Sequence, residues 1–254
     1  MNRSAPSRPG FTLIELLVVI AIVSLLVGLA VPALSHARRS GQRAVCLSNL
    51  HQINVAIRCY ASANGGVIPF GPKGRPVTGS NFYPCTGVVT SLISLENGDP
   101  VGLGLTLQEF LNQQPKALFC PGVDQLVDAN AELAKVGTAQ AQCSYYYRHN
   151  SVAILSGDPP PEHINLDDLG TNRNGLPIRA LALDTMFLCD RSLWPFGVLP
   201  RTHHQLEYAD VLFVDGHAST RPNMDGRFTV DIGYQPYDAF DKILSAFERA
   251  DAEY

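Results

Sequence analysis

The densest group of side chains able to do chemistry lies near the C-terminus, where histidines and aspartates recur within a short stretch. The group consists of His203, His204, Asp210, Asp215 and His217. Imidazole nitrogens and carboxylate oxygens bind divalent metal ions, so the group could hold one and support metal-dependent catalysis. A simpler interpretation is turn chemistry, because an Asp-Gly pair at the end of a strand commonly has its carboxylate bonded to its own backbone. The sequence leaves both interpretations open.

Cysteine is the second reactive residue type. The chain has six cysteines, an even number that predicts disulfides if this part of the chain leaves the reducing cytoplasm. Many pairings are open. Our preferred bridge joins Cys120 to Cys143 and would contribute about 3 kcal/mol by closing a loop, while Cys85 and Cys189 are further candidates. The absence of a C-x-x-C pair leaves a zinc ribbon and a thioredoxin-like redox site without support.

The bulk composition narrows the function classes. The chain has 254 residues, of which 46% are hydrophobic and 17% charged, so most of it should fold. Its formal net charge is −4 and no basic patch occurs, which argues against nucleic-acid binding. No phosphate loop, G-x-G-x-x-G or G-x-S-x-G motif is present, so nucleotide binding and serine hydrolysis lack support. We therefore expect a protein that is not an enzyme.

The elements that must position these groups begin with an apolar stretch at residues 11–34, where Glu15 is the only charge. As a helix it would be roughly 36 Å long, enough to cross a hydrocarbon core of about 30 Å. A buried core helix is the alternative, but such helices usually keep a polar stripe, which this stretch lacks. The small-x-small site Ser35-His36-Ala37 leaves ordinary signal-peptide cleavage open. The balanced flanking arginines do not settle the orientation.

The segment RPGFTLIE at residues 8–15 resembles the type IV prepilin signature. The resemblance implies that a prepilin peptidase cuts after Gly10 and methylates the new N-terminal Phe11. It also implies that Glu15 meets the N-terminal amine of a neighbouring subunit during assembly. Pro32 falls where the family commonly carries a proline, which would remove a helical hydrogen bond and bend or locally melt the helix.

A looser resemblance extends into the rest of the chain. The segments CLSNLHQI at 46–53, FCP at 119–121 and SYYY at 144–147 look like markers of a pilin-like subfamily abundant in planctomycetes. In that subfamily nine residues separate a histidine from a C-terminal Asp-Gly, whereas here ten residues separate His204 from Asp215. Type II secretion pseudopilins carry calcium in a C-terminal loop, and by that resemblance calcium is the one cofactor to test, at Asp184, Asp210 and Asp215.

These patterns predict an α+β, pilin-like fold in which a long N-terminal helix packs on a small antiparallel sheet. The predicted segments are a leader (1–10), a transmembrane assembly helix (11–34), the soluble half of that helix (35–63) and an exported domain (64–254). A stop for the long helix is expected at Asn64-Gly65-Gly66. Further predicted strands cover residues 180–183, 211–214 and 228–232, and further predicted helices cover residues 105–112, 125–135 and 238–250.

The function expected from the resemblance is structural: a subunit of a type II secretion pseudopilus or a type IV pilus. Its partners would be prepilin peptidase, other pilin subunits and an assembly platform in the bacterial inner membrane, with the C-terminal domain in the periplasm. Two alternatives come from other classes. One is a membrane-anchored periplasmic enzyme that uses a metal bound by the cluster from His203 to His217. The other is a module that binds a surface polymer through Trp194 and the tyrosines at 145–147.

Overall fold

The computed structural model describes residues 12–72, 77–78, 81–82, 88–122, 124–150, 164–184, 186–196, 200–235 and 238–254. Gly10, Phe11 and Cys85 lie outside these residues, so what the sequence predicts for them stays a prediction. The chain divides into two compact units, Met1–Gly41 and Gln42–Tyr254. The segment boundaries predicted at residues 10, 34 and 63 are not tested by this division.

Helix α1 (Leu13–Ala63) includes the apolar stretch from Leu13 onward and the soluble half predicted at residues 35–63. Pro32 lies inside the helix, so the hydrogen bond that proline removes neither melts nor ends it. The helix ends at the predicted glycines, where Gly65 and Gly66 have φ values of 66° and 89°. The amide of Gly66 donates to the carbonyl oxygen of Ala61 over 2.7 Å and so satisfies one of the last helical carbonyls. The predicted long helix and its stop are confirmed.

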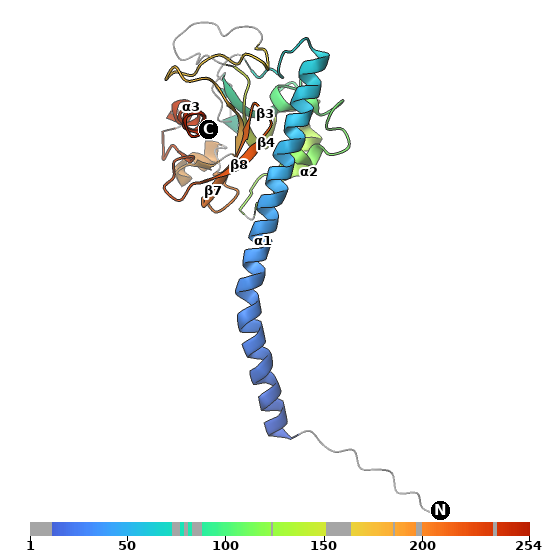
Figure 1. The fold of residues 1–254 in the computed structure, drawn as a ribbon, viewed down its shortest axis with the longest axis vertical. Helices are drawn as coiled ribbons and strands as arrows, with labels where there is room; N and C mark the ends of the chain where they lie inside the picture. Colours follow the sequence, from blue (N-terminus) through green and yellow to red (C-terminus); the bar gives the residue numbers. More distant parts are fainter. Residues whose placement is uncertain are drawn as a thin grey trace, which may run out of the picture. The chain divides into compact units, whose positions relative to one another are not determined.

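The second unit is built on a five-stranded antiparallel sheet with the order β3-β4-β5-β7-β8. The strands are β3 (Val89–Ser94), β4 (Ala141–Arg148), β5 (Ala180–Asp184), β7 (Tyr208–Phe213) and β8 (Ala218–Pro222). The C-terminal part of α1 covers one face, and helix α3 (Ala239–Ala252) covers the other (Figure 1). This arrangement is the predicted α+β fold.

Side chains of β4 alternate between the two faces and so supply two separate cores. Tyr145 and Tyr147 join Leu50 of α1 in one apolar cluster, while Tyr146 joins Phe247 of α3 in the other. All three tyrosines are at most 1% exposed. They are therefore core residues, and the polymer-binding alternative keeps only Trp194, which is 41% exposed.

The remaining elements are β1 (Val77–Thr78), β2 (Asn81–Phe82), η1 (Gly102–Thr106), η2 (Pro115–Leu118), α2 (Ala129–Lys135), β6 (Phe187–Leu188), η4 (Arg191–Phe196) and β9 (Val230–Asp231). The predicted strands at 180–183 and 211–214 and the predicted helix at 238–250 are confirmed as β5, β7 and α3. The strand expected at 228–232 is shortened to β9. The helix expected at 125–135 begins later, where Asp128 accepts a 2.7 Å hydrogen bond from the amide of Ala131.

The helix predicted at residues 105–112 is wrong. A short 3-10 helix, η1, comes first, and turns follow it. The reason is close packing on β3: a Cβ at Gly104 would lie 1.7 Å from the carbonyl oxygen of Ile93. The backbone here is thus shaped by its contact with the sheet, which helical periodicity does not report.

Asp251 fastens the end of α3 to the sheet. Its Oδ2 accepts hydrogen bonds from Arg148 at 2.9 Å and from Asn172 at 3.0 Å. Its Oδ1 accepts from the backbone amides of Arg179 and Ala180 at 2.9 and 2.8 Å. The side chains of Arg148 and Asp251 are 4% and 0% exposed. Either charge would be left buried and uncompensated if the other were removed.

Candidate functional site

The first candidate site is the start of α1, where Thr12 and Glu15 bond to each other. The amide and the hydroxyl of Thr12 both donate to Glu15 Oε2, at 2.8 and 2.7 Å. The amide of Glu15 donates in return to the Thr12 hydroxyl oxygen at 3.2 Å. This is a capping box with its usual T-x-x-E spacing. Glu15 therefore has partners within its own chain, which the sequence analysis missed although the spacing was visible.

Beyond this cap, α1 presents apolar side chains in every direction. The large apolar residues between Leu13 and Leu34 are 48% to 78% exposed. Among the described residues, α1 is the one helix whose length and composition suit a membrane crossing. A cleavable signal sequence meets the same criterion, so the kind of anchor has to be decided by its processing motif.

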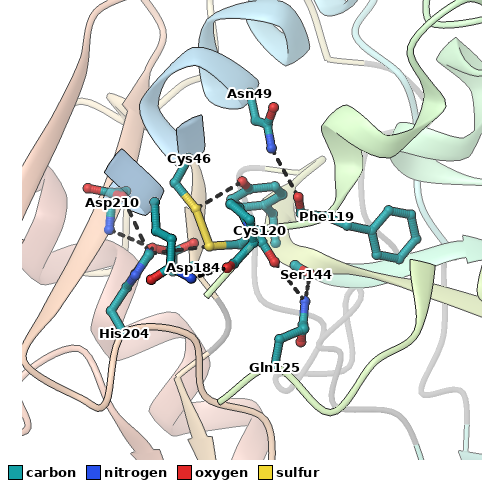
Figure 2. Close-up of a disulfide and its surroundings, with 12 residues drawn as sticks. Cys46, Asn49, Phe119, Cys120, Gln125, Ser144, Asp184, His204 and Asp210 are labelled. Atoms are coloured by element: carbon teal, nitrogen blue, oxygen red, sulfur yellow. Dashed lines mark hydrogen bonds and ion pairs between the residues drawn. A yellow bond between two sulfur atoms is a disulfide. The ribbon is translucent and has the colours of Figure 1, made fainter. Parts of the chain in front are cut away.

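The second candidate site is a buried polar cluster beside the sheet (Figure 2). Cys46 of α1 and Cys120, which follows η2, form a disulfide with their Cα atoms 5.3 Å apart. Asp184 ends β5, Asp210 lies on β7, and His204 lies in the loop before β7. None of the five side chains belongs to a residue more than 5% exposed.

The Nε2 atom of His204 is the centre of this cluster. It lies 3.3 Å from Cys120 Sγ, 3.4 Å from Asp184 Oδ2 and 3.5 Å from Asp210 Oδ2. Two carboxylate oxygens, Asp184 Oδ1 and Asp210 Oδ2, are buried without a hydrogen-bond partner. Such orphaned oxygens are unusual in a folded protein and call for a cation or a proton.

Electrostatics in the cluster favour retention of positive charge. Burial and the neighbouring Asp184 carboxylate raise the pKa of Asp210 to about 7. Burial alone would lower the pKa of His204, but the nearby carboxylates of Asp184 and Asp210 outweigh it and the pKa is raised. The cluster thus attracts a cation or holds an extra proton.

The loop that carries His204 is held in a specific conformation. Gln205 and Leu206 have positive φ values of 53° and 62°, which are uncommon for residues other than glycine. Asp124 Oδ2 accepts hydrogen bonds from the Thr202 hydroxyl and, at 3.1 Å, from the amide of Gln205. A Cβ at Gly122 would lie 1.7 Å from the carbonyl oxygen of His203. The segment after Cys120 therefore packs directly against this loop.

The structure brings together only some of the candidates from the C-terminal group. Asp184, Asp210 and His204 meet, whereas Asp215 and His217 lie beyond the other end of β7. The amide of His217 donates to Asp215 Oδ1 at 3.0 Å, and its Nδ1 lies 2.8 Å from the same oxygen. This exposed pair matches the turn interpretation of the Asp-Gly segment.

The predicted disulfide between Cys120 and Cys143 is wrong. Cys120 pairs with Cys46, and Cys143 is a free, buried thiol that donates to the carbonyl oxygen of Tyr145 at 3.3 Å. Burial raises the pKa of Cys143 to about 12, so it behaves as a small apolar residue. The sequence does place Cys46 on the buried stripe of α1, one helical turn before Leu50, but nothing in it marks Cys46 as the partner of Cys120.

Comparison with known proteins supports the interpretation of the N-terminus as a prepilin-like signature. Residues 6–31 match the family model described as the prokaryotic N-terminal methylation motif. No curated protein and no solved structure matches the chain. The motif is consistent with a type IV pilin-like signature, and it implies processing by prepilin peptidase and assembly with other pilin subunits. Together with the apolar helix, it is also consistent with anchoring in the inner membrane.

Proposed function

We propose that this chain is a structural subunit of a type IV pilin-like filament, either a type II secretion pseudopilus or a type IV pilus. Prepilin peptidase would cut between Gly10 and Phe11 on the cytoplasmic side and methylate the amine of Phe11. The C-terminal domain would then lie in the periplasm or on an assembled filament. The proposal rests on the methylation motif at residues 6–31, which overlaps in sequence with the start of an apolar helix whose side chains are exposed.

Assembly would exchange one apolar environment for another. In the membrane, the side chains between Leu13 and Leu34 contact lipid, and in a filament they would pack against the same segments of neighbouring subunits. Glu15 would release its bonds to Thr12 and pair with the methylated amine of the next subunit. The capping box therefore keeps the carboxylate hydrogen-bonded while the subunit waits in the membrane.

The mature N-terminus tests the proposal most directly. Intact-mass and peptide mass spectrometry of the chain from its native membrane should identify N-methylated Phe11 as the first residue. A chain that begins within residues 34–38 would show cleavage by ordinary signal peptidase and would overturn the proposal. A chain that keeps residues 1–10 would overturn the processing step.

The membrane-anchored enzyme remains the competing hypothesis, and it would need a substrate to reach His204. In the structure this residue is 5% exposed, and Asp184 beside it is 0% exposed. Their burial supports a structural role for the cluster over a catalytic one.

A further inference from the structure

We propose that Cys46, Cys120, Asp184 and His204 bind one Zn²⁺ ion when the two thiols are reduced, so that the metal and the disulfide are alternative occupants of one site. The inference does not depend on filament assembly. It begins from the arrangement of four potential ligand atoms, one from each residue, that all lie within 4.8 Å of one another.

The two separations from His204 fit a tetrahedral centre, and reduction would free the two sulfurs to move apart to the remaining ligand positions. Zinc binds cysteine sulfur at about 2.3 Å and histidine nitrogen or carboxylate oxygen at about 2.0–2.2 Å, so neighbouring ligand atoms are about 3.3–3.8 Å apart. The distances from His204 Nε2 to Cys120 Sγ and to Asp184 Oδ2 are 3.3 and 3.4 Å. Two thiolates, one imidazole and one carboxylate form a donor set that suits zinc.

The hydrogen-bond pattern supplies a second, independent argument. His204 Nε2 faces a sulfur and two carboxylate oxygens, but a neutral ring nitrogen has at most one proton to donate. Asp184 Oδ1 has no hydrogen-bond partner although its residue is 0% exposed. A cation among these atoms would bind the nitrogen and offset the buried charge of the Asp184 carboxylate, which the disulfide does not do.

The position of the four residues indicates a structural zinc site. Cys46 lies on the buried face of α1 and Cys120 on the segment after η2, while Asp184 and His204 come from the sheet and the loop beside it (Figure 2). Four protein ligands leave no open coordination position, and all four residues are at most 5% exposed. A zinc ion here would link the long helix to the domain, as the disulfide does.

The two states differ by a balanced reaction. Zinc binding converts two thiols to thiolates, releases two protons and transfers no electrons. Disulfide formation removes two protons and two electrons from the same thiols and needs a thiol oxidant as electron acceptor. Conversion of the disulfide back to the zinc-binding state needs a reductant, which is itself oxidised. Cytosolic thiols stay reduced, so the newly made chain carries both cysteines as thiols before it meets an oxidant.

The test uses the full chain in detergent micelles, prepared once with a phosphine reductant and once oxidised. Each sample receives excess Zn²⁺, is desalted, and is analysed for zinc and protein by mass spectrometry. We expect one zinc per reduced chain and less than about a tenth of that per oxidised chain. Co²⁺ in place of zinc should give the thiolate-to-metal charge-transfer band and the strong visible bands of a tetrahedral site.

Variants separate this site from incidental binding. His204→Ala and Asp184→Asn should each weaken zinc binding by more than about 100-fold, since outer contacts alone change metal affinity by about 10–100-fold. Cys143→Ser, which removes a buried thiol outside the site, should bind zinc as the unchanged chain does. If a ligand variant does not fold, the redox comparison and the Co²⁺ spectrum still decide. A reduced chain without stoichiometric zinc, equal binding in both redox states, or a Co²⁺ spectrum without a thiolate band would overturn the proposal.

Discussion

Removal of the Cys46–Cys120 disulfide would measure how much this link between α1 and the domain contributes to the free energy of unfolding. The disulfide joins residues separated by 74 positions in sequence. In the chain-entropy model a loop of this length restricts the unfolded chain by about 4.5 kcal/mol at 25 °C, compared with about 3 kcal/mol for the shorter Cys120–Cys143 loop expected from sequence. The double variant Cys46→Ala/Cys120→Ala should lose about this much unfolding free energy.

Urea titration of the oxidised full chain in micelles, with a chelator present, would measure the effect. The near-ultraviolet circular dichroism of the buried tyrosines Tyr145, Tyr146 and Tyr147 reports on the domain core. With a urea dependence of about 2 kcal/mol per M, the midpoint should fall by about 2 M. The chelator keeps zinc from replacing the lost link in any partly reduced protein.

Cys143→Ala is the matched control, because it removes a buried sulfur without a cross-link. The free energy of unfolding of Cys143→Ala should fall by about 1 kcal/mol, as for a typical core substitution. If the double variant loses no more unfolding free energy than twice the loss measured for Cys143→Ala, the disulfide does not restrict the unfolded chain.

Four further predictions concern other parts of the chain. Asp251→Ala should lose about 3–5 kcal/mol in urea titration, because it leaves Arg148 buried without its counter-charge. Arg173→Ala breaks ion pairs with Asp241 and with the largely buried Glu248, but it should lose less than Asp251→Ala because the Arg173 side chain is 36% exposed. Burial lowers the pKa of His149 from 6.5 to about 3, so the unfolded chain binds the extra proton and stability falls as the pH drops from 6.5 towards 3. Between pH 6.5 and 5 this contributes about 2 kcal/mol, which His149→Gln should abolish in paired urea titrations. Glu15→Ala should leave cleavage after Gly10 intact, by N-terminal mass, but remove filaments from both the cell-envelope fraction and the sheared-surface fraction.

Each of these predictions has a contradicting result. An Asp251→Ala chain as stable as Arg173→Ala would show that the buried pair has no special role. Equal acid sensitivity of the His149→Gln chain would assign the pH effect to other groups. Glu15→Gln keeps the spacing of the capping box but not the charge, so it should also fail to assemble. Normal filaments from Glu15→Ala or Glu15→Gln would rule out the proposed pairing with a neighbouring amine.

The sequence predicted the parts of the structure that depend on local pattern. Helix α1, its glycine stop, strands β5 and β7, and helix α3 follow from periodicity and from turn residues. Strand β3 was missed because all six of its residues are buried, polar Thr90 and Ser91 included, so no alternation marks it. The helix expected at 105–112 failed because packing on the sheet, not helical propensity, shapes that backbone.

Only part of the candidate site could be predicted from the sequence, because the rest depends on contacts between distant segments of the chain. Asp184, Asp210 and His204 could be named from their chemistry, but which of them meet depends on strand register. The partner of Cys120 is 74 residues away on α1, and no local rule selects it. Asp215 and His217 looked equivalent to the others because they are close in sequence, yet β7 carries them to its opposite end.

The link at Cys46 also has a mechanical consequence. Apolar packing between α1 and the sheet at Leu50, Ile53 and Ile57 resists separation, but it is not directional and opposes sliding along the helix axis less. A slip by one turn, about 5.4 Å, would also break hydrogen bonds from α1 to the domain, such as those from Asn49 to the Phe119 carbonyl oxygen and from Arg43 to Thr220. A covalent or metal bond at Cys46 prevents that slip because it fixes one residue of the helix to one point of the domain. The link therefore sets the axial position of the helix under tension.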